Sequence, residues 1–198
     1  MSTRAGIVLA GGFARRFGDC DKTLAELRGK PLIAHAVQSL RPAVDRVIVS
    51  CRHEQRPSFE RVLSNVTYRP DPTPDEGPLA GLDAALDGLD ATAVAVSTAD
   101  RPLVPTDLYR HLFDARSAEA IVIRAEGIDQ PVPAVFDAPA LRTAVSDQRA
   151  RGTRRLRAVL DAVEYTTVPA TMVARRWGEH ALVDVNTPAQ LDRLNESR

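Results

Sequence analysis

The sequence predicts an α/β fold with a mainly parallel sheet, formed by one domain that spans residues 1–198. Short runs rich in β-branched residues recur along the chain, and segments with helical spacing of apolar residues lie between them. Most of these runs are apolar throughout, so we expect strands that are buried on both faces, as in a parallel sheet. The expected strands are residues 6–10, 46–50, 92–98, 120–124 and 181–185.

Four segments between and after these runs have helical patterns. Pro31 and Pro188 each stand at a favourable first helical position. Thr106 and Thr187 are expected to act as N-caps, because a threonine hydroxyl can accept a bond from a free amide of the first turn. The expected helices cover residues 31–40, 77–89, 106–115 and 187–194.

Two other segments are rich in turn-forming residues. Residues 69–78 contain several Pro and Asp residues but are too short for a domain linker. Residues 127–139 predict an excursion from the sheet that reaches over the site. Ligands of such folds bind beyond the carboxyl ends of the strands. A ligand is therefore expected near the strand-to-loop junctions, which are residues 10–22, 50–52, 69–81, 98–102 and 184–187.

Composition narrows the class of protein. Lys and Arg total 26, as do Asp and Glu, so net charge indicates neither a nucleic-acid nor a membrane partner. No apolar run approaches the length of a membrane span. The two cysteines, Cys20 and Cys51, have no metal-site spacing and suit a reducing compartment, so we expect a cytoplasmic protein. The histidines form no metal-spaced pair and are expected to be structural or exposed. They are His35, His53, His111 and His180.

The opening stretch GIVLAGGFARRFGDCDK, residues 6–22, predicts a phosphate-binding turn. Its glycines let the backbone approach a ligand and turn amides toward an anion. Arg15, Arg16 and Lys22 add positive charge that suits a polyphosphate. The spacing matches neither the P-loop nor the dinucleotide fingerprint. The alternative is an ordinary strand-to-helix turn with arginines on the surface.

Asp100 follows the apolar run 92–98. A carboxylate in that position suits Mg²⁺, which prefers one or two carboxylates together with phosphate oxygens and water. An Asx turn before Pro102 is the alternative, and position alone does not decide between them.

Several motifs resemble one known family. The matching segments are LAGGFARRFG at 9–18, DK at 21–22, GKPL at 29–32, GPLAG at 77–81, DRP at 100–102 and VNTP at 185–188. Together they resemble nucleotidyltransferases of the sugar-nucleotide type, and within that group the molybdenum cofactor guanylyltransferases. The resemblance covers nearly the whole chain. It implies a Rossmann-like three-layer sandwich of the nucleotide-diphospho-sugar transferase type.

The resemblance also implies an activity. GMP would pass from GTP to the phosphate of molybdenum-molybdopterin, giving a guanine dinucleotide cofactor and pyrophosphate. The reaction would use Mg²⁺, with Mn²⁺ as the other candidate. The implied partners are these small molecules and, in transient contact, proteins that deliver or receive the cofactor. The chain would act as a monomer or a weak homo-oligomer.

Residue roles follow from the matched positions. The implied catalytic residues are Arg15, Lys22 and Asp100, with Asp100 as the metal ligand. The implied nucleotide contacts are Leu9, Ala10, Gly11, Gly12, Lys22, Ser50, Asp71, Gly77, Pro78, Leu79, Gly81 and Asp100. The implied acceptor contacts are Gln130, Arg154, Arg155 and Asn186.

Some of these roles have alternatives. Asp75 or Glu76 could replace Asp71, Asn186 could be a turn residue, and the arginines at 149–157 could form a solvated face. Lys30 either belongs to the site or is an ordinary cation at a helix start.

Ser50 departs from the family pattern, which commonly has an asparagine there. A hydroxyl cannot match the paired hydrogen bonds of a carboxamide, so this position does not identify the base. The overall resemblance alone favours guanine over cytosine, and cytosine over adenine.

Two rival functions remain. One is a related nucleotidyltransferase that uses CTP or another phosphorylated acceptor, such as a cofactor precursor or a sugar phosphate. The other is a nucleotide-binding protein without transfer activity.

Overall fold

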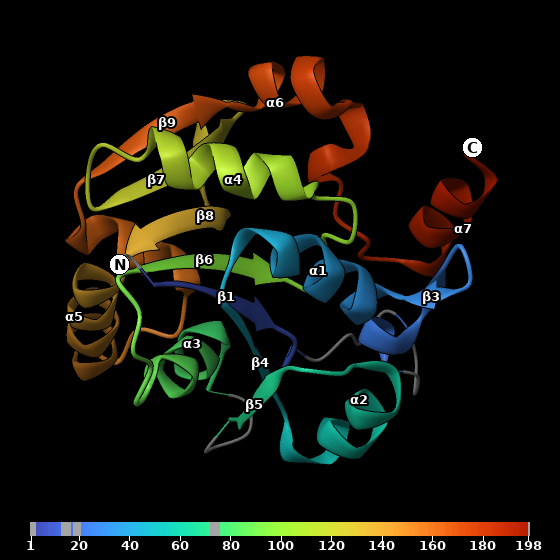
Figure 1. Cartoon of the computed structure of the whole chain (residues 1–198), viewed down its shortest axis with the longest axis horizontal. Coiled ribbons are helices and arrows are strands. Elements are labelled where there is room, and N and C mark those ends of the chain that lie inside the picture. The colour runs from blue at the N-terminus through green and yellow to red at the C-terminus, as the bar shows by residue number, and fades with distance from the viewer. Residues whose placement is uncertain (1–2, 13–16, 18–20, 72–75, 198) are drawn as a thin grey trace.

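The structure is a computed structural model that describes residues 3–12, 17, 21–71 and 76–197. A seven-stranded sheet forms its centre, in the order β5-β4-β1-β6-β8-β7-β9 (Figure 1). Its strands are β1 (Arg4–Leu9), β4 (Arg46–Cys51), β5 (Thr67–Pro70), β6 (Ala93–Thr98), β7 (Ala120–Ala125), β8 (Ile128–Asp137) and β9 (Tyr165–Pro169). A small antiparallel pair consists of β2 (Glu26–Leu27) and β3 (Lys30–Pro31).

Helices cover both faces of this sheet (Figure 1). The α-helices are α1 (Leu32–Leu40), α2 (Arg56–Val62), α3 (Pro78–Leu86), α4 (Thr106–Ala115), α5 (Ala138–Ala150), α6 (Ala170–Trp177) and α7 (Pro188–Glu196). The 3₁₀ segments are Lys22–Leu24, Arg41–Ala43, His53–Gln55, Leu156–Ala162 and Glu179–Leu182. One apolar cluster joins the sheet to α1, α4 and α6, and a second joins its other face to α3 and α5. The expected three-layer α/β sandwich is therefore confirmed.

Alternation along the strands explains why apolar residues fill whole runs. On β1, Val8 belongs to the first cluster while Ile7 and Leu9 belong to the second. On β4, Val49 and Ile48 divide in the same way. Successive strand side chains point to opposite faces, and both faces here are covered by helices.

The sheet is mainly parallel, as expected. β1 pairs in parallel with β4 and β6, and β4 pairs in parallel with β5. β7 pairs in parallel with β9. β8 alone runs against its neighbours β6 and β7.

The expectation for residues 127–139 was wrong. Most of this segment forms β8, a ten-residue strand inside the sheet and not an excursion. Turn-forming residues predicted a loop, but pairing with β6 and β7 on both sides outweighs local preference, because strand propensity depends on tertiary context.

The strand expected at 181–185 is also absent. Residues Glu179–Leu182 form a 3₁₀ turn, and the following residues continue in irregular backbone. Ala181 and Val185 are buried, so the apolar run does mark burial. Its backbone, however, bonds to a loop: the Val185 amide donates to the Asp100 carbonyl at 2.8 Å.

Some helix ends differ by a few residues from expectation. Pro31 and Pro105 are the N-caps of α1 and α4, so Thr106 lies inside its helix and its hydroxyl donates to the Ser39 carbonyl at 2.7 Å. α3 ends at Leu86, before the expected residue 89. Thr187 does cap α7, with its hydroxyl accepting from the Gln190 amide at 3.2 Å.

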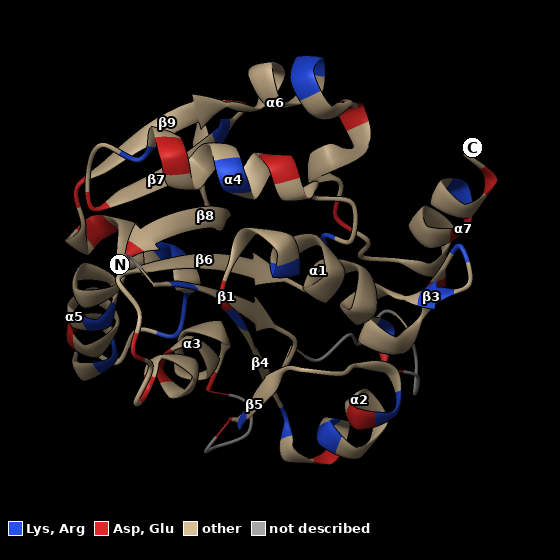
Figure 2. Cartoon of the chain, viewed as in Figure 1, with Lys and Arg blue, Asp and Glu red and all other residues tan. Residues whose placement is uncertain are grey.

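Charges of both signs are interspersed on the helices of both faces (Figure 2). Within the described residues, no helix is long and apolar enough to cross a bilayer.

Candidate active site

A cavity of about 510 Å³ lies at the carboxyl edge of the sheet, where the loops after β1, β5 and β6 meet the end of β4. That volume is within the range of small-molecule sites, roughly 300–1,000 Å³. The lining residues are Leu9, Ala10, Gly11, Gly12, Lys22, Thr23, Ser50, Asp71, Glu76, Gly77, Pro78, Gly81, Thr98, Ala99, Asp100 and Asn186. Parallel strands bring these segments together because their carboxyl ends share one edge.

Three polar side chains converge at one end of the cavity. The Lys22 ammonium Nζ lies 3.1 Å from Asp100 Oδ2 and 3.3 Å from Asn186 Oδ1. Their segments are far apart in sequence, and the Lys22 side chain is only 13% exposed. A cation therefore stands beside two oxygen ligands, which suits a site for phosphates and a metal ion.

Arg101 ties together the two loops that carry Asp100 and Asn186. Its guanidinium makes a two-pronged contact with the Asp184 carboxylate, with Nη2 to Oδ2 at 3.2 Å, and it also donates to the Val132 carbonyl of β8. The Val185 amide completes the link by donating to the Asp100 carbonyl. Sequence reasoning missed Arg101, although its place directly after Asp100 was a usable signal.

The other end of the cavity contains a hydroxyl–carboxylate pair. Ser50 Oγ donates to Asp71 Oδ1 at 3.0 Å. Glycine lies against both members of this pair: a Cβ on Gly11 would lie 2.3 Å from Asp71 Oδ2, and one on Gly81 would lie 2.5 Å from Ser50 Oγ, so either Cβ would displace a partner of the hydrogen bond. Burial raises the pKa of the Asp71 carboxyl, while the Ser50 hydrogen bond and the nearby Arg52 charge act in the opposite direction.

Most of the implied nucleotide contacts lie around the cavity, and Leu79 does not. Its side chain is fully buried in the core between α3 and the sheet. Its amide faces the Arg154 carbonyl at 3.5 Å. Arg15 and Arg16, as well as Cys20 and Asp75, fall outside the described residues.

The implied acceptor residues divide into two groups. Asn186 lines the cavity, whereas Gln130, Arg154 and Arg155 do not. Gln130 lies on β8 opposite Ile123 and is half-buried. Arg154 and Arg155 are exposed just before the 3₁₀ segment Leu156–Ala162. The Arg154 carbonyl would lie 2.9 Å from a Cβ on Gly77, so this loop borders the cavity's rim.

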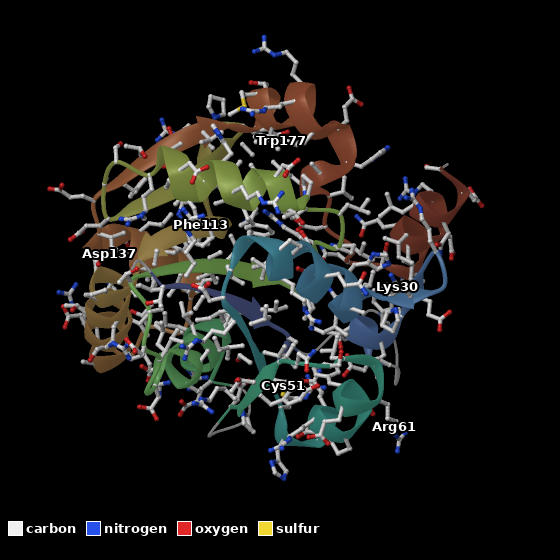
Figure 3. All side chains as sticks on the ribbon, in the orientation of Figure 1. Lys30, Cys51, Arg61, Phe113, Asp137 and Trp177 are labelled. Atoms are coloured by element: carbon white, nitrogen blue, oxygen red, sulfur yellow. The ribbon has the colours of Figure 1, made fainter. Side chains whose placement is uncertain are left out.

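Other charged candidates have structural partners. Arg149 contacts Glu76 at 3.0 Å and Asp83 at 3.3 Å. Lys30, on β3 beside α7, donates to Gln38 Oε1 at 2.9 Å and lies outside the cavity lining (Figure 3). It is therefore an ordinary cation near a helix start.

Among the described residues, cysteine and histidine form no second candidate site. Cys51 is fully buried on β4, and burial raises the pKa of its thiol to about 12 (Figure 3). His35 Nε2 lies 2.8 Å from the Leu27 carbonyl, and the His111 ring tilts against Trp177. Across the part of the chain that the structure describes, three or more His, Cys, Asp or Glu residues nowhere gather as metal ligands would.

The fold and the cavity at this edge of the sheet define a class of protein, the α/β proteins whose ligands bind beyond the carboxyl ends of parallel strands. The MobA-like NTP transferase domain matches residues 6–168. A Haloferax mediterranei protein named probable molybdenum cofactor guanylyltransferase is 34% identical, over 98% of this chain and 94% of its own length. The chain therefore belongs to the MobA-like NTP transferase family, and it is by that membership a nucleotidyltransferase.

Solved structures share the fold. Molybdopterin-guanine dinucleotide biosynthesis protein A of Archaeoglobus fulgidus superposes with a TM-score of 0.78 at 22% identity, covering 98% of this chain and 97% of its own. A Mycobacterium tuberculosis protein solved in complex with manganese has a TM-score of 0.70 at 20% identity, covering all of both chains.

Proposed function

We propose that this protein transfers GMP from GTP to the phosphate of molybdenum-molybdopterin, giving a guanine dinucleotide cofactor and pyrophosphate. The name of the Haloferax relative, at near full coverage, supports the activity. The observation that carries the proposal is the division of one cavity into two ends. Lys22, Asp100 and Asn186 stand at one end, and the Ser50–Asp71 pair stands at the other.

The separation of the two ends suits a nucleotide. β4, which carries Ser50, and β6, which precedes Asp100, lie on opposite sides of β1. Two strand spacings amount to roughly 10 Å, enough to separate a base from its phosphates.

Asp71 is the proposed reader of the base. Guanine alone among the nucleotide bases presents two adjacent donors, its ring N1–H and its amino group, on the pairing edge. A carboxylate offers two acceptor oxygens to such a pair. Ser50 would then support Asp71 through the 3.0 Å hydrogen bond and need not contact the base itself. This role would answer the question raised by a serine in the place of an asparagine.

A divalent metal ion would suit the opposite end, where it would take over the oxygens that the Lys22 ammonium contacts in this structure. The Asp100 carboxylate and the Asn186 amide oxygen are both hard oxygen donors beside the cavity, and Mg²⁺ completes such a set with phosphate oxygens and water. Asp100 would hold the ion with help from Asn186, and Mn²⁺ is the second candidate. When bound, the ion would neutralise phosphate charge during the transfer.

The chain's own groups would act by positioning and charge. Lys22 would donate to the α-phosphate, where negative charge grows in the transition state. An acceptor phosphate oxygen forms the new bond to the α-phosphorus as the α–β bridging bond breaks, and that electron pair leaves with pyrophosphate. The acceptor phosphate is already an anion, so no side chain has to remove a proton from it.

The acceptor would approach from the rim beside α3. Arg154 and Arg155 are exposed there, and their guanidinium groups suit an anionic pterin phosphate. Gln130 and Asn186 would contribute polar contacts. The free, buried Cys51 agrees with a reducing compartment, and we propose the cytoplasm as the location.

Pyrophosphate release tests the proposal. Purified protein is incubated with Mg²⁺, the phosphorylated pterin and each nucleoside triphosphate in turn. GTP is expected to support release and formation of the dinucleotide, and the Asp100→Ala variant is expected to support neither. Release with CTP but not with GTP would refute the base assignment. Release with GTP and a sugar phosphate, but not with the pterin, would refute the acceptor.

A further inference from the structure

Two side chains from the segment after β4 bind the glycine turn after β1. Arg52 Nη1 donates to the Gly11 carbonyl at 2.9 Å and to the Gly12 carbonyl at 3.1 Å. Gln55 Nε2 donates to the Ala10 carbonyl at 3.1 Å. Three successive carbonyl groups of the turn are thus held by two side chains.

Because the peptide unit is planar, each of these hydrogen bonds to a carbonyl also fixes the direction of the next residue's N–H. In a trans peptide, the carbonyl of one residue and the N–H of the next point in opposite directions. Gln55 therefore turns the Gly11 N–H away from itself by holding the Ala10 carbonyl. Arg52 does the same to the Gly12 N–H by holding the Gly11 carbonyl. Both glycines line the cavity.

The same two side chains also reach the segment that carries Lys22. Gln55 Nε2 donates to Asp21 Oδ2 at 2.7 Å, and Arg52 Nη2 lies 3.7 Å from that oxygen. The other Asp21 oxygen accepts from the Thr23 amide at 2.9 Å and caps the 3₁₀ turn that begins at Lys22. One polar network therefore supports the glycine turn and the lysine together.

Burial makes this network rigid. The Gln55 residue is 4% exposed, and the Arg52 side chain is 14% exposed. The Gln55 side-chain oxygen accepts from the Arg52 amide at 2.8 Å, so the two residues also fix each other. A charged donor held by several partners at low exposure has few alternative positions.

We propose that Arg52 and Gln55 are positioning residues that orient the Gly12 amide and the Lys22 segment toward the phosphates of the nucleotide before it binds. This inference rests on the proposed function. Neither residue is part of the cavity lining. They remove the cost of reorienting the turn on binding, so their contribution is to affinity for the phosphates and not for the base.

The test compares ligands with and without phosphates. Calorimetry measures the binding of GTP with Mg²⁺ and of guanosine to wild type and to the Arg52→Ala and Arg52→Lys variants. Arg52→Ala is expected to weaken GTP binding about tenfold, through the loss of two charge-assisted hydrogen bonds to the turn, and to leave guanosine binding unchanged. Arg52→Lys should recover only part of the loss, since a single ammonium lacks the planar fork of a guanidinium.

Kinetics and a matched control complete the design. The KM for GTP should rise in Arg52→Ala while kcat falls much less. Arg56→Ala is the control, because Arg56 is half-exposed and pairs with Glu60 on α2. It is expected to bind GTP as wild type does. If Arg52→Ala does not fold, Gln55→Ala is compared in the same way, with the same expected loss confined to GTP.

Three outcomes would overturn the inference. A folded Arg52 variant that binds GTP as wild type does would refute it while leaving the proposed function intact. Equal losses for GTP and guanosine would indicate a general collapse of the pocket and would also refute it. Wild-type protein that binds no GTP would refute the proposed function and the inference with it.

Discussion

The pair formed by Arg101 and Asp184 allows a quantitative test of how the site is assembled. Arg101 follows Asp100, and Asp184 lies two residues before Asn186, so the pair joins the two loops that bring these site residues together. Arg101→Ala removes both this pair and the bond to the Val132 carbonyl, whereas Asp184→Ala removes the pair and leaves that bond in place. A double-mutant cycle with Asp184→Ala isolates the contribution of the pair.

Burial sets the expected magnitude. The Arg101 side chain is 12% exposed and that of Asp184 is 38% exposed. Removing one partner of a fully buried ion pair costs about 3–5 kcal/mol. Because Asp184 remains partly solvated, we expect a loss of about 2 kcal/mol for Arg101→Ala and a coupling of about 1.5 kcal/mol in the cycle. That is a large part of a typical unfolding free energy of about 5–15 kcal/mol.

Urea unfolding measures these free energies, and an exposed pair of the same residue types provides the control. Arg110 and Asp107 lie three residues apart on α4, with side chains 50% and 69% exposed, and their nitrogen–oxygen distance is 2.9 Å. Their cycle should give a coupling of about 0.3 kcal/mol. Pyrophosphate release by Arg101→Ala should fall by more than the loss of folded protein explains, because the loops that carry Asp100 and Asn186 lose the ion pair that joins them.

Equal coupling in the two cycles would refute this reasoning. So would an Arg101→Ala variant with wild-type stability and wild-type pyrophosphate release. Either result would mean that the loops are held by their backbone bonds alone, such as the one from the Val185 amide to the Asp100 carbonyl.

Three further predictions concern the cavity itself. Burial raises the pKa of the Asp71 carboxyl above its usual value of about 3.9. Affinity for GTP should therefore fall as the pH is lowered through this raised pKa, because the carboxylate becomes protonated. The Asp71→Asn variant should bind GTP weakly and should not show this loss of affinity at acidic pH. Lys22→Ala and Asp100→Ala should each lower pyrophosphate release more than about hundredfold with normal circular dichroism, whereas Lys30→Ala should match wild type. Gly81→Ala should raise the KM for GTP despite the higher helix propensity of alanine, because its Cβ would lie 2.9 Å from Asp71 Oδ1; an unchanged KM would contradict that contact.

Most of the strands could be predicted from the pattern of apolar residues. The runs at 6–10, 46–50, 92–98 and 120–124 all became strands within one or two residues at each end, because burial on both faces leaves a continuous apolar signal. The same pattern failed for β8 and for the run at 181–185. The first has turn-forming residues but is paired on both sides, and the second is buried without a strand partner.

The site shows the same division. Lys22 and Asp100 could be selected from sequence because residue types that bind phosphate and metal stand just after apolar runs, and most of the other selected nucleotide contacts line the cavity. Leu79 was selected with its motif, yet its side chain faces the core. A motif match assigns a role to every residue in it, while the direction of each side chain depends on packing.

The sequence by itself therefore determined the class of fold, the family and the edge of the sheet where the chemistry gathers. These depend on local composition and on the order of segments along the chain. Only the tertiary structure decided which groups support that edge. Arg52 bonds to a carbonyl 41 positions away in sequence, and Arg101 to a carboxylate 83 positions away. No local pattern encodes such contacts, because the distance between two long polar side chains is fixed only when the strands that carry them pack into one sheet.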